Sequence, residues 1–204
     1  MKGEGLETYE PKYTWHGFQY VEMTGYAGTP DLATLEGRFI HTTCEPVGTF
    51  ECSNDLINNI HRCTVQSLRC NLQGLPLDCP QRDERLGWLG DAHVTAELAM
   101  LNLDMASLYT KWLRDINAQQ DDLGRISMIA PRPGIEEDLP WSSAWFLTPW
   151  YMYCAYGQES VLEEHYDGLE RYMNFLSTQA ESHIQQACWA GDHLSVAEQH
   201  GGKR

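Results

Sequence analysis

Four carboxylates and two arginines are crowded into residues 78–91 of this 204-residue chain, in the stretch DCPQRDERLGWLGD. The charged residues are Asp78, Arg82, Asp83, Glu84, Arg85 and Asp91. Carboxylates that lie close together raise one another's pKa, whereas a neighbouring arginine keeps a carboxylate ionised. A loop of this composition can keep one acid protonated beside others that are charged, which is the arrangement that general acid catalysis needs.

The same stretch carries groups suited to binding a sugar. Pro80, Gly87 and Gly90 keep most of it out of a helix, so that its side chains can converge on one point. Trp88 offers a flat apolar face of the kind that stacks on a sugar ring, and Arg82 can donate hydrogen bonds to hydroxyls. A second interpretation stays open at this point, in which the charges form a structural network on the surface or at the entrance to a helix.

Helical patterns lie on both sides of this stretch. They cover about residues 53–71, 92–103, 104–119, 143–156 and 159–181. Ser53 and Asp91 are suited to cap the first two helices, and Pro149 is expected to kink or shorten the fourth. Apolar stripes are predicted in the first helix at Leu56, Ile60, Cys63 and Leu68, and in the last at Leu162, Tyr166, Leu169, Met173 and Leu176.

The amino-terminal part has a different pattern. Residues 13–43 combine partly alternating aromatic runs (TWHGFQYVEM and GRFIHTT) with the turn material GYAGTPD, which predicts strands and turns. Two or three strands do not make a stable sheet alone. We therefore expect residues 1–48 to be the end of a β-domain with a linker, and residues 49–204 to belong to a helical domain.

The composition narrows the possible partners. A net charge of −15 and a pI near 4.8 argue against nucleic acids and anionic membranes, and leave neutral ligands such as sugars open. No apolar run is long enough to cross a membrane, and the N-terminus lacks the apolar core of a signal peptide. Seven cysteines without a CxxC pair predict reduced thiols, a cytoplasmic setting and a packing role for Cys79. The histidine and cysteine spacing predicts no metal site, and no cofactor is expected.

The stretch DCPQRDERLGWLGD resembles the signature of the bacterial α-L-rhamnosidases, whose catalytic domain is an (α/α)6 barrel, or six-hairpin glycosidase. YTWHGFQYVEMTGY is similar to the end of the β-sandwich that precedes the barrel, and EPVGTFECSNDLINNIHRCTVQS to the first barrel helix. WSSAWFLTPWYMYCAYG resembles a later aromatic helix, and GDHLS the loop after it. The resemblance implies a mainly α fold, a partial (α/α)6 barrel preceded by the end of a β-sandwich.

What the resemblance implies about function is hydrolysis of terminal α-L-rhamnosides with inversion, on a rhamnose-containing glycoside or oligosaccharide. Glu84 matches the family's proposed general acid. The rhamnose pocket of the family is matched by Asp78, Arg82, Trp88 and Asp91, and Trp141 is a further candidate for its wall. Two alternatives stay open: a sugar-binding remnant without catalysis, and another six-hairpin glycosidase.

Two positions depart from the family pattern. Ser142 and Ser143 stand where the family has an aspartate in WGDA, and His193 stands for the tryptophan of GDW, which puts the substrate preference in doubt. Trp145 and Trp150 are predicted to belong to the core, since aromatics at helical spacing usually do.

The general base of an inverting enzyme is a second carboxylate. In the family it lies much later in the chain, and no residue after 192 matches it. A six-hairpin barrel also needs more helices than the five or so predicted here. We therefore expect this chain to be part of a longer enzyme, to express poorly or aggregate alone, and to leave p-nitrophenyl α-L-rhamnoside uncleaved.

Overall fold

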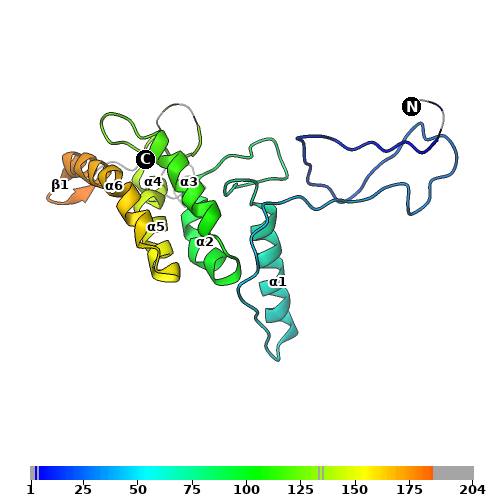
Figure 1. The fold of residues 1–204 in the computed structure, drawn as a ribbon, viewed down its shortest axis with the longest axis horizontal. Coiled ribbons are helices and arrows are strands. Elements are labelled where there is room, and N and C mark those ends of the chain that lie inside the picture. The colour runs from blue at the N-terminus through cyan, green and yellow to red at the C-terminus, as the bar shows by residue number, and fades with distance from the viewer. Residues whose placement is uncertain (1–2, 4, 133, 135, 186–204) are drawn as a thin grey trace, which may run out of the picture.

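The fold is built of helices (Figure 1). The computed structural model describes residues 3, 5–132, 134 and 136–185, and the elements named here lie within them. In chain order they are α1 (Asp55–Cys70), α2 (Leu89–Asn102), α3 (Ala106–Ala118), α4 (Leu139–Ser142), α5 (Ala144–Tyr156), α6 (Glu159–Gln179), β1 (Ala180–Glu181) and β2 (Ile184–Gln185). The two short strands pair antiparallel after α6. The mainly α fold predicted from the sequence is confirmed.

The helix boundaries differ in detail from those predicted. Helix α1 is capped by Asn54 rather than Ser53, because the Asn54 side chain accepts hydrogen bonds from two backbone N–H groups of the first turn. Helix α2 begins at Leu89, so Asp91 lies in its first turn instead of at its cap, where a negative charge still suits the helix dipole. Helix α5 runs through Pro149 to its end at Tyr156, so the proline does not shorten it.

The amino-terminal segment leads away from the helices as extended chain (Figure 1). The strands predicted within residues 13–43 are wrong for the described residues, which form no paired strand there. A strand needs a hydrogen-bonding neighbour along its length, whereas this segment and the residues after it touch the helical part at separate points. Thr42 N–H donates to the Leu72 carbonyl (2.7 Å), and Val47 N–H donates to the Asn102 carbonyl (3.0 Å).

One apolar core joins α2, α3, α5 and α6. Trp112 and Leu113 of α3 and Trp145 and Met152 of α5 are fully buried in it. Burying a large apolar side chain stabilises a fold by roughly 1.5–3 kcal/mol, so these residues dominate the stability of the helical part. The core prediction is confirmed for Trp145 and wrong for Trp150, which is 53% exposed. Helix α5 is apolar on nearly every side, and its sequence period therefore did not reveal the buried face.

Helix α1 is attached to this core by little more than Leu68. The predicted stripe exists in sequence, but Leu56 and Ile60 are 67% and 57% exposed. None of the α1 residues is buried. The apolar face of α1 is therefore uncovered by the part of the chain that the structure describes.

The buried face of α6 is rotated from the predicted one. The residues that point into the core are Val161, His165, Gly168, Tyr172 and Leu176, whereas Tyr166 and Met173 of the predicted stripe are 62% and 50% exposed. Gly168 lies on the buried face because a Cβ there would come within 2.7 Å of the Asn117 side-chain oxygen and 2.9 Å of the Trp145 ring. Because His165 and Gly168 are not strongly apolar residues, the pattern of apolar residues in the sequence did not reveal this buried face.

His165 makes the helical core sensitive to acid. It is 1% exposed against the Trp145 ring, and neither ring nitrogen has a hydrogen-bond partner among the described residues. Burial lowers the pKa of His165, while the neighbouring Glu164 opposes this and Arg114 adds to it. In the unfolded chain His165 binds a proton near pH 6.5, whereas in the folded chain it stays neutral until the pH reaches its lowered pKa. The free energy of unfolding therefore falls as the pH drops from about 6.5 towards that lowered pKa.

We expect His165→Phe to flatten this dependence, because phenylalanine keeps the ring packed on Trp145 and removes the titrating group. Between pH 7 and pH 5, denaturant unfolding should show the wild-type chain losing up to about 1.4 kcal/mol per pH unit relative to His165→Phe. Equal slopes for the two chains would show that His165 is protonated without cost in the folded state.

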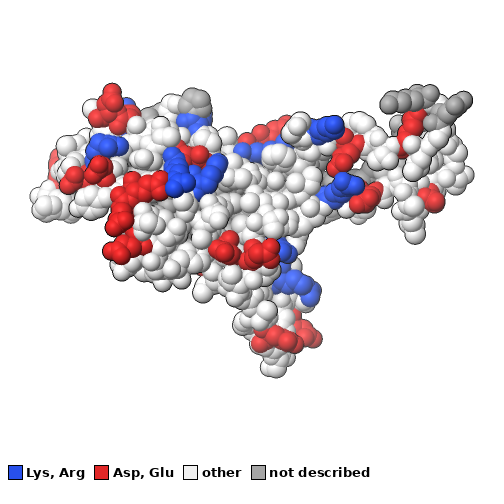
Figure 2. All heavy atoms as spheres, viewed as in Figure 1, with Lys and Arg blue, Asp and Glu red and all other residues white. Residues whose placement is uncertain are grey.

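The surface shows the acidic balance of the sequence. The chain has 29 Asp and Glu residues against 14 Lys and Arg, and on the face drawn in Figure 2 the basic side chains lie in small groups near acidic ones. Several are paired: Arg114 donates two hydrogen bonds to Glu164 (2.6 and 2.9 Å). None of the helices within the described residues combines the length and the apolar composition that a membrane span requires.

Candidate active site

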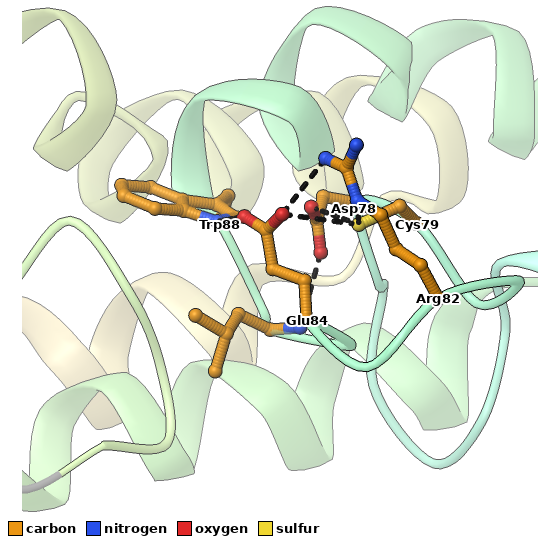
Figure 3. Close-up of polar contacts among 6 residues, drawn as sticks. Asp78, Cys79, Arg82, Glu84 and Trp88 are labelled. Carbon is orange, nitrogen blue, oxygen red and sulfur yellow. Dashed lines mark hydrogen bonds and ion pairs between the residues drawn. The ribbon is translucent and has the colours of Figure 1, made fainter.

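The carboxylate loop, residues 78–88, lies between α1 and α2 and is closed by two hydrogen bonds between Asp78 and Leu86. Asp78 N–H donates to the Leu86 carbonyl (3.1 Å), and Leu86 N–H donates back to Asp78 Oδ1 (3.0 Å). The pair ties the first part of the loop to the last. The intervening residues are therefore held as a compact turn from which several side chains point to the same place (Figure 3).

The end of the loop is fixed against a segment more than thirty residues later. Ala130 N–H donates to the Gly87 carbonyl (2.9 Å), and Leu89 N–H donates to the Met128 carbonyl (2.8 Å). A Cβ on Gly87 would lie 2.2 Å from the Ala130 carbonyl oxygen and 2.6 Å from Leu75 Cδ1. Glycine is required here so that two backbones can approach each other closely.

Glu84 is the centre of the loop's side chains (Figure 3). Its Oε1 accepts a hydrogen bond from the indole Nε1 of Trp88 (2.9 Å), and its Oε2 accepts one from Arg82 Nη2 (2.7 Å). The Glu84 side chain is 32% exposed, so it stays accessible to a ligand. Three residues predicted as a site are thus brought into direct contact.

Cys79 joins this cluster, which the sequence did not reveal. It is buried, as a packing residue should be, but its thiol also donates towards Asp78 Oδ2 (2.6 Å) and Glu84 Oε2 (3.5 Å), and its Sγ accepts a hydrogen bond from Arg82 Nε (3.1 Å). Burial raises the pKa of the Cys79 thiol, and its bond to Asp78 raises it further. A protonated thiol of this kind is a poor nucleophile, and it acts here as a polar link between the two carboxylates.

Ligand atoms of Asp78, Cys79 and Glu84 lie within 4.8 Å of one another, a spacing that a metal ion can use. These atoms are already hydrogen-bonded among themselves and to the guanidinium of Arg82. A positive side chain inside the cluster disfavours a second cation. The absence of a metal from this site stays a prediction.

The pKa of Glu84 is lowered from its ordinary value. The indole donor of Trp88 contributes most, and the Cys79 thiol and the Arg82 charge add to it, while burial works in the opposite direction. The expectation that crowded carboxylates raise the pKa of one acid is therefore not met at Glu84. Its hydrogen-bond donors and the Arg82 charge outweigh the effect of burial, and Glu84 is a carboxylate at neutral pH in this structure.

Asp78 and Asp91 share an open groove of about 450 Å³ between α1 and α2. The groove is lined by Cys63, Thr64, Ser67, Leu68, Asn71, Leu77, Asp78, Asp91, Val94, Thr95 and Leu98. Asp78 therefore links two features, because it borders the groove with one side and belongs to the Glu84 cluster through its hydrogen bonds. The lining is mixed, with hydroxyl, amide and carboxylate groups next to apolar ones, as in many sites for small neutral ligands.

Trp141 lies against the start of α2. A Cβ on Gly90 would come within 2.6 Å of Trp141 Cδ1 and 2.7 Å of its Nε1, so the indole ring occupies the space above this glycine. His93, one turn further along α2, bonds through Nε2 to the Pro140 carbonyl (2.9 Å) and lies 3.3 Å from Ser143 Oγ. Ser143, in the first departure from the family pattern, thus helps to fix the short helix that carries Trp141.

Ser142, in the same departure, is buried and donates to the Ile126 carbonyl (2.8 Å). This hydroxyl therefore serves the fold instead of facing a ligand. His193 lies outside the described residues.

We expect Gly90→Ala to displace Trp141, because the new methyl group would overlap the indole ring. The ring is half-buried and can move outward, so the fold should survive with a loss of about 1–3 kcal/mol, typical of overpacking. The displacement should change the fluorescence of Trp141, measured as the difference spectrum against Trp141→Phe. Gly37→Ala is the matched control, since a Cβ there meets nothing within 4 Å. An unchanged emission spectrum would place the Trp141 ring elsewhere.

Matches to known protein families identify the class of protein to which this chain belongs. Residues 45–204 match the family described as the bacterial alpha-L-rhamnosidase 6 hairpin glycosidase domain, and residues 1–41 match the concanavalin-like domain of the same enzymes. The helices described above are therefore part of a six-hairpin glycosidase fold. The chain belongs to the bacterial α-L-rhamnosidase family, whose members are glycoside hydrolases.

Relatives support the same assignment. An α-L-rhamnosidase of Streptomyces avermitilis is 35% identical over 98% of this chain, and one of Formosa agariphila is 35% identical over 91%. Among solved structures, the S. avermitilis enzyme complexed with L-rhamnose has a TM-score of 0.89 at 36% identity and covers 97% of this chain. The enzyme of Dictyoglumus thermophilum has a TM-score of 0.82 at 47% identity over 84%. The chain spans about a fifth of the length of each of these proteins.

Proposed function

We propose that this chain carries the general-acid side of an inverting α-L-rhamnosidase active site. Glu84 protonates the glycosidic oxygen as the bond to the leaving group breaks. The sugar is held by Asp78, Arg82, Trp88, Asp91 and Trp141. The observation that carries the proposal is the convergence of Arg82, Trp88 and Cys79 on the Glu84 carboxyl, in a loop that stays open to solvent.

A general acid has to be protonated when the substrate is bound, and the pKa of Glu84 is lowered in the free site. A bound sugar excludes water from the carboxyl group and competes for the Trp88 and Arg82 donors. Both effects raise the pKa of a carboxyl group, because both disfavour its charged form. Substrate binding is therefore the step that prepares Glu84 to act as an acid.

Inversion also needs a base. The second carboxylate of an inverting glycosidase lies roughly 6.5–9.5 Å from the acid, with room for a water molecule between them. We assign this base to the part of the relatives' length that the present chain does not span. We likewise keep the division into a β-domain end at 1–48 and a barrel part at 49–204, which the separate matches of residues 1–41 and 45–204 support.

Sugar binding without hydrolysis is the second candidate function. The specific observation in its favour is the lowered pKa of Glu84, which leaves the group unprotonated unless a ligand changes its surroundings. In that case the loop would use Glu84 as a hydrogen-bond acceptor for a hydroxyl group and not as a proton donor.

Calorimetric titration of the chain with L-rhamnose tests the binding part of both functions. We expect a dissociation constant of about 1 mM, weakened about tenfold by Asp78→Asn, which keeps an acceptor for Leu86 N–H but removes the charge. L-fucose serves as the control sugar and should bind more weakly. Binding of both sugars with equal affinity, or of neither, would contradict a rhamnose site.

A chimera separates hydrolysis from binding. In it, this chain replaces the matching segment of the S. avermitilis enzyme. Turnover of an α-L-rhamnoside by the folded chimera supports the hydrolase, whereas rhamnose binding without turnover supports the sugar-binding protein.

A further inference from the structure

We propose that Trp15, in the amino-terminal segment, is a positioning residue for Glu84, and that it acts by holding the strained turn at Arg85. The inference deepens the proposed function and rests on it for the role of Glu84. Trp15 is seventy positions from Arg85 in the sequence and belongs to a segment that lies outside the helical part.

The turn at Arg85 is the first element of the argument. Arg85 has a φ of 48°, in the left-handed region that residues other than glycine rarely adopt. This turn follows Glu84 directly and precedes Leu86, whose N–H donates to Asp78 Oδ1 (3.0 Å). The backbone at Arg85 therefore sets the direction of the Glu84 side chain and the position of the amide that holds Asp78.

A strained backbone persists only where its surroundings hold it, and the contacts of Arg85 supply the restraint. Arg85 Nε donates to the Pro80 carbonyl (3.2 Å), and Arg85 Nη2 donates to the Trp15 carbonyl (2.9 Å). The guanidinium carbon also lies 5.3 Å from the centre of the Trp15 ring, within the range of a cation–π interaction. The Arg85 side chain thus reaches the amino-terminal segment.

The segment around Trp15 contacts the carboxylate loop at two points. Trp15 is half-buried, while the residues on either side of it are exposed. Two residues further on, a Cβ on Gly17 would lie 2.5 Å from Gln81 Cβ and 2.8 Å from its Cα, so the segment rests directly on the carboxylate loop at a second point. The two contacts together restrain the carboxylate loop at residues 81 and 85, on either side of Glu84 in the sequence.

The indole N–H of Trp88 reports on the position of Glu84, because it donates to Glu84 Oε1 (2.9 Å). We would record tryptophan indole resonances of the ¹⁵N-labelled 204-residue chain and assign that of Trp88 with Trp88→Phe. In Trp15→Ala we expect this resonance to move upfield and broaden, and the dissociation constant for L-rhamnose to rise about tenfold, the size of one lost cation–π contact. Trp15→Phe keeps an aromatic face and should remain close to the wild type.

Two further variants complete the test. Arg85→Gly adopts the left-handed turn without strain but has no anchor, and it should move the Trp88 resonance as Trp15→Ala does. Trp150→Ala, which removes a half-exposed tryptophan on α5, should leave it unchanged. A native Trp88 resonance in both Trp15→Ala and Arg85→Gly would overturn the proposal. A displaced resonance in a chain that binds no L-rhamnose would support the positioning role and overturn the proposed function.

Discussion

Replacing Glu84 by glutamine in the chimera with the S. avermitilis enzyme is expected to lower the hydrolysis of an α-L-rhamnoside with an alkyl leaving group by about 10²- to 10⁴-fold. Glutamine keeps the size of the side chain and an acceptor for Trp88 Nε1–H, but it has no proton to give to the leaving oxygen. The measurement is kcat by steady-state kinetics. KM should change little, because the hydrogen bond that orients the side chain is retained.

The leaving group provides an internal control. p-Nitrophenolate leaves with little help from an acid, so Glu84→Gln should lower its release far less than that of an alkyl alcohol. Asp83→Asn is the matched variant, since it removes an exposed carboxylate from the neighbouring position of the same loop. An equal loss for both leaving groups would mean that Glu84 binds the sugar without acting as an acid, and a full rate on the alkyl substrate would remove it from catalysis altogether.

Gly87→Ala is expected to destabilise the chain more than any other single change at the loop. The added methyl group would lie 2.2 Å from the Ala130 carbonyl oxygen, and a backbone atom cannot turn aside as the end of a side chain can. Overpacking of this kind costs typically 1–3 kcal/mol and occasionally more. At about 3 kcal/mol the midpoint of thermal unfolding should fall by about 6–12 °C in a chain of this length.

Circular dichroism during heating measures this shift, with Gly37→Ala as the control because open space surrounds that glycine. The hydrogen bond from Ala130 N–H to the Gly87 carbonyl makes a second readout, since hydrogen exchange at Ala130 should accelerate in Gly87→Ala. An unchanged melting temperature would show that the two backbones are further apart in solution.

The candidate site was accessible from the sequence because its parts are close in the chain. Glu84, Arg82 and Trp88 fall within seven residues, with Pro80 just before them and Gly87 among them, so convergence required no knowledge of distant contacts. Cys79 was not predicted to belong to the site, because a small buried thiol is expected to be a packing residue unless its polar neighbours are known. The protonation state of Glu84 was not predicted either, because its pKa depends on which neighbouring side chains donate hydrogen bonds to it, and the geometry of the folded loop decides that.

The positions of the helices were likewise predictable from the sequence, but the side of each helix that is buried was not always predictable. The inner face of α6 includes His165 and Gly168, which no apolar period marks, because Gly168 serves the close approach of Asn117 and Trp145. The amino-terminal strands show the opposite error. Their residues favour extended chain, yet a strand needs a partner along its length, and that is a property of the assembly of segments.

The sequence by itself determined the family, the helical class and the chemical composition of the carboxylate loop, because each of these is encoded in residues near one another in the chain. Only the tertiary structure decided which groups hold that loop in shape. Gly87 meets Ala130, Gly90 lies under Trp141, and Arg85 reaches back to Trp15, all across distances that local pattern does not report. Such contacts depend on how whole helices and segments pack together, and the residues near a position in the sequence do not indicate which distant residue will contact it.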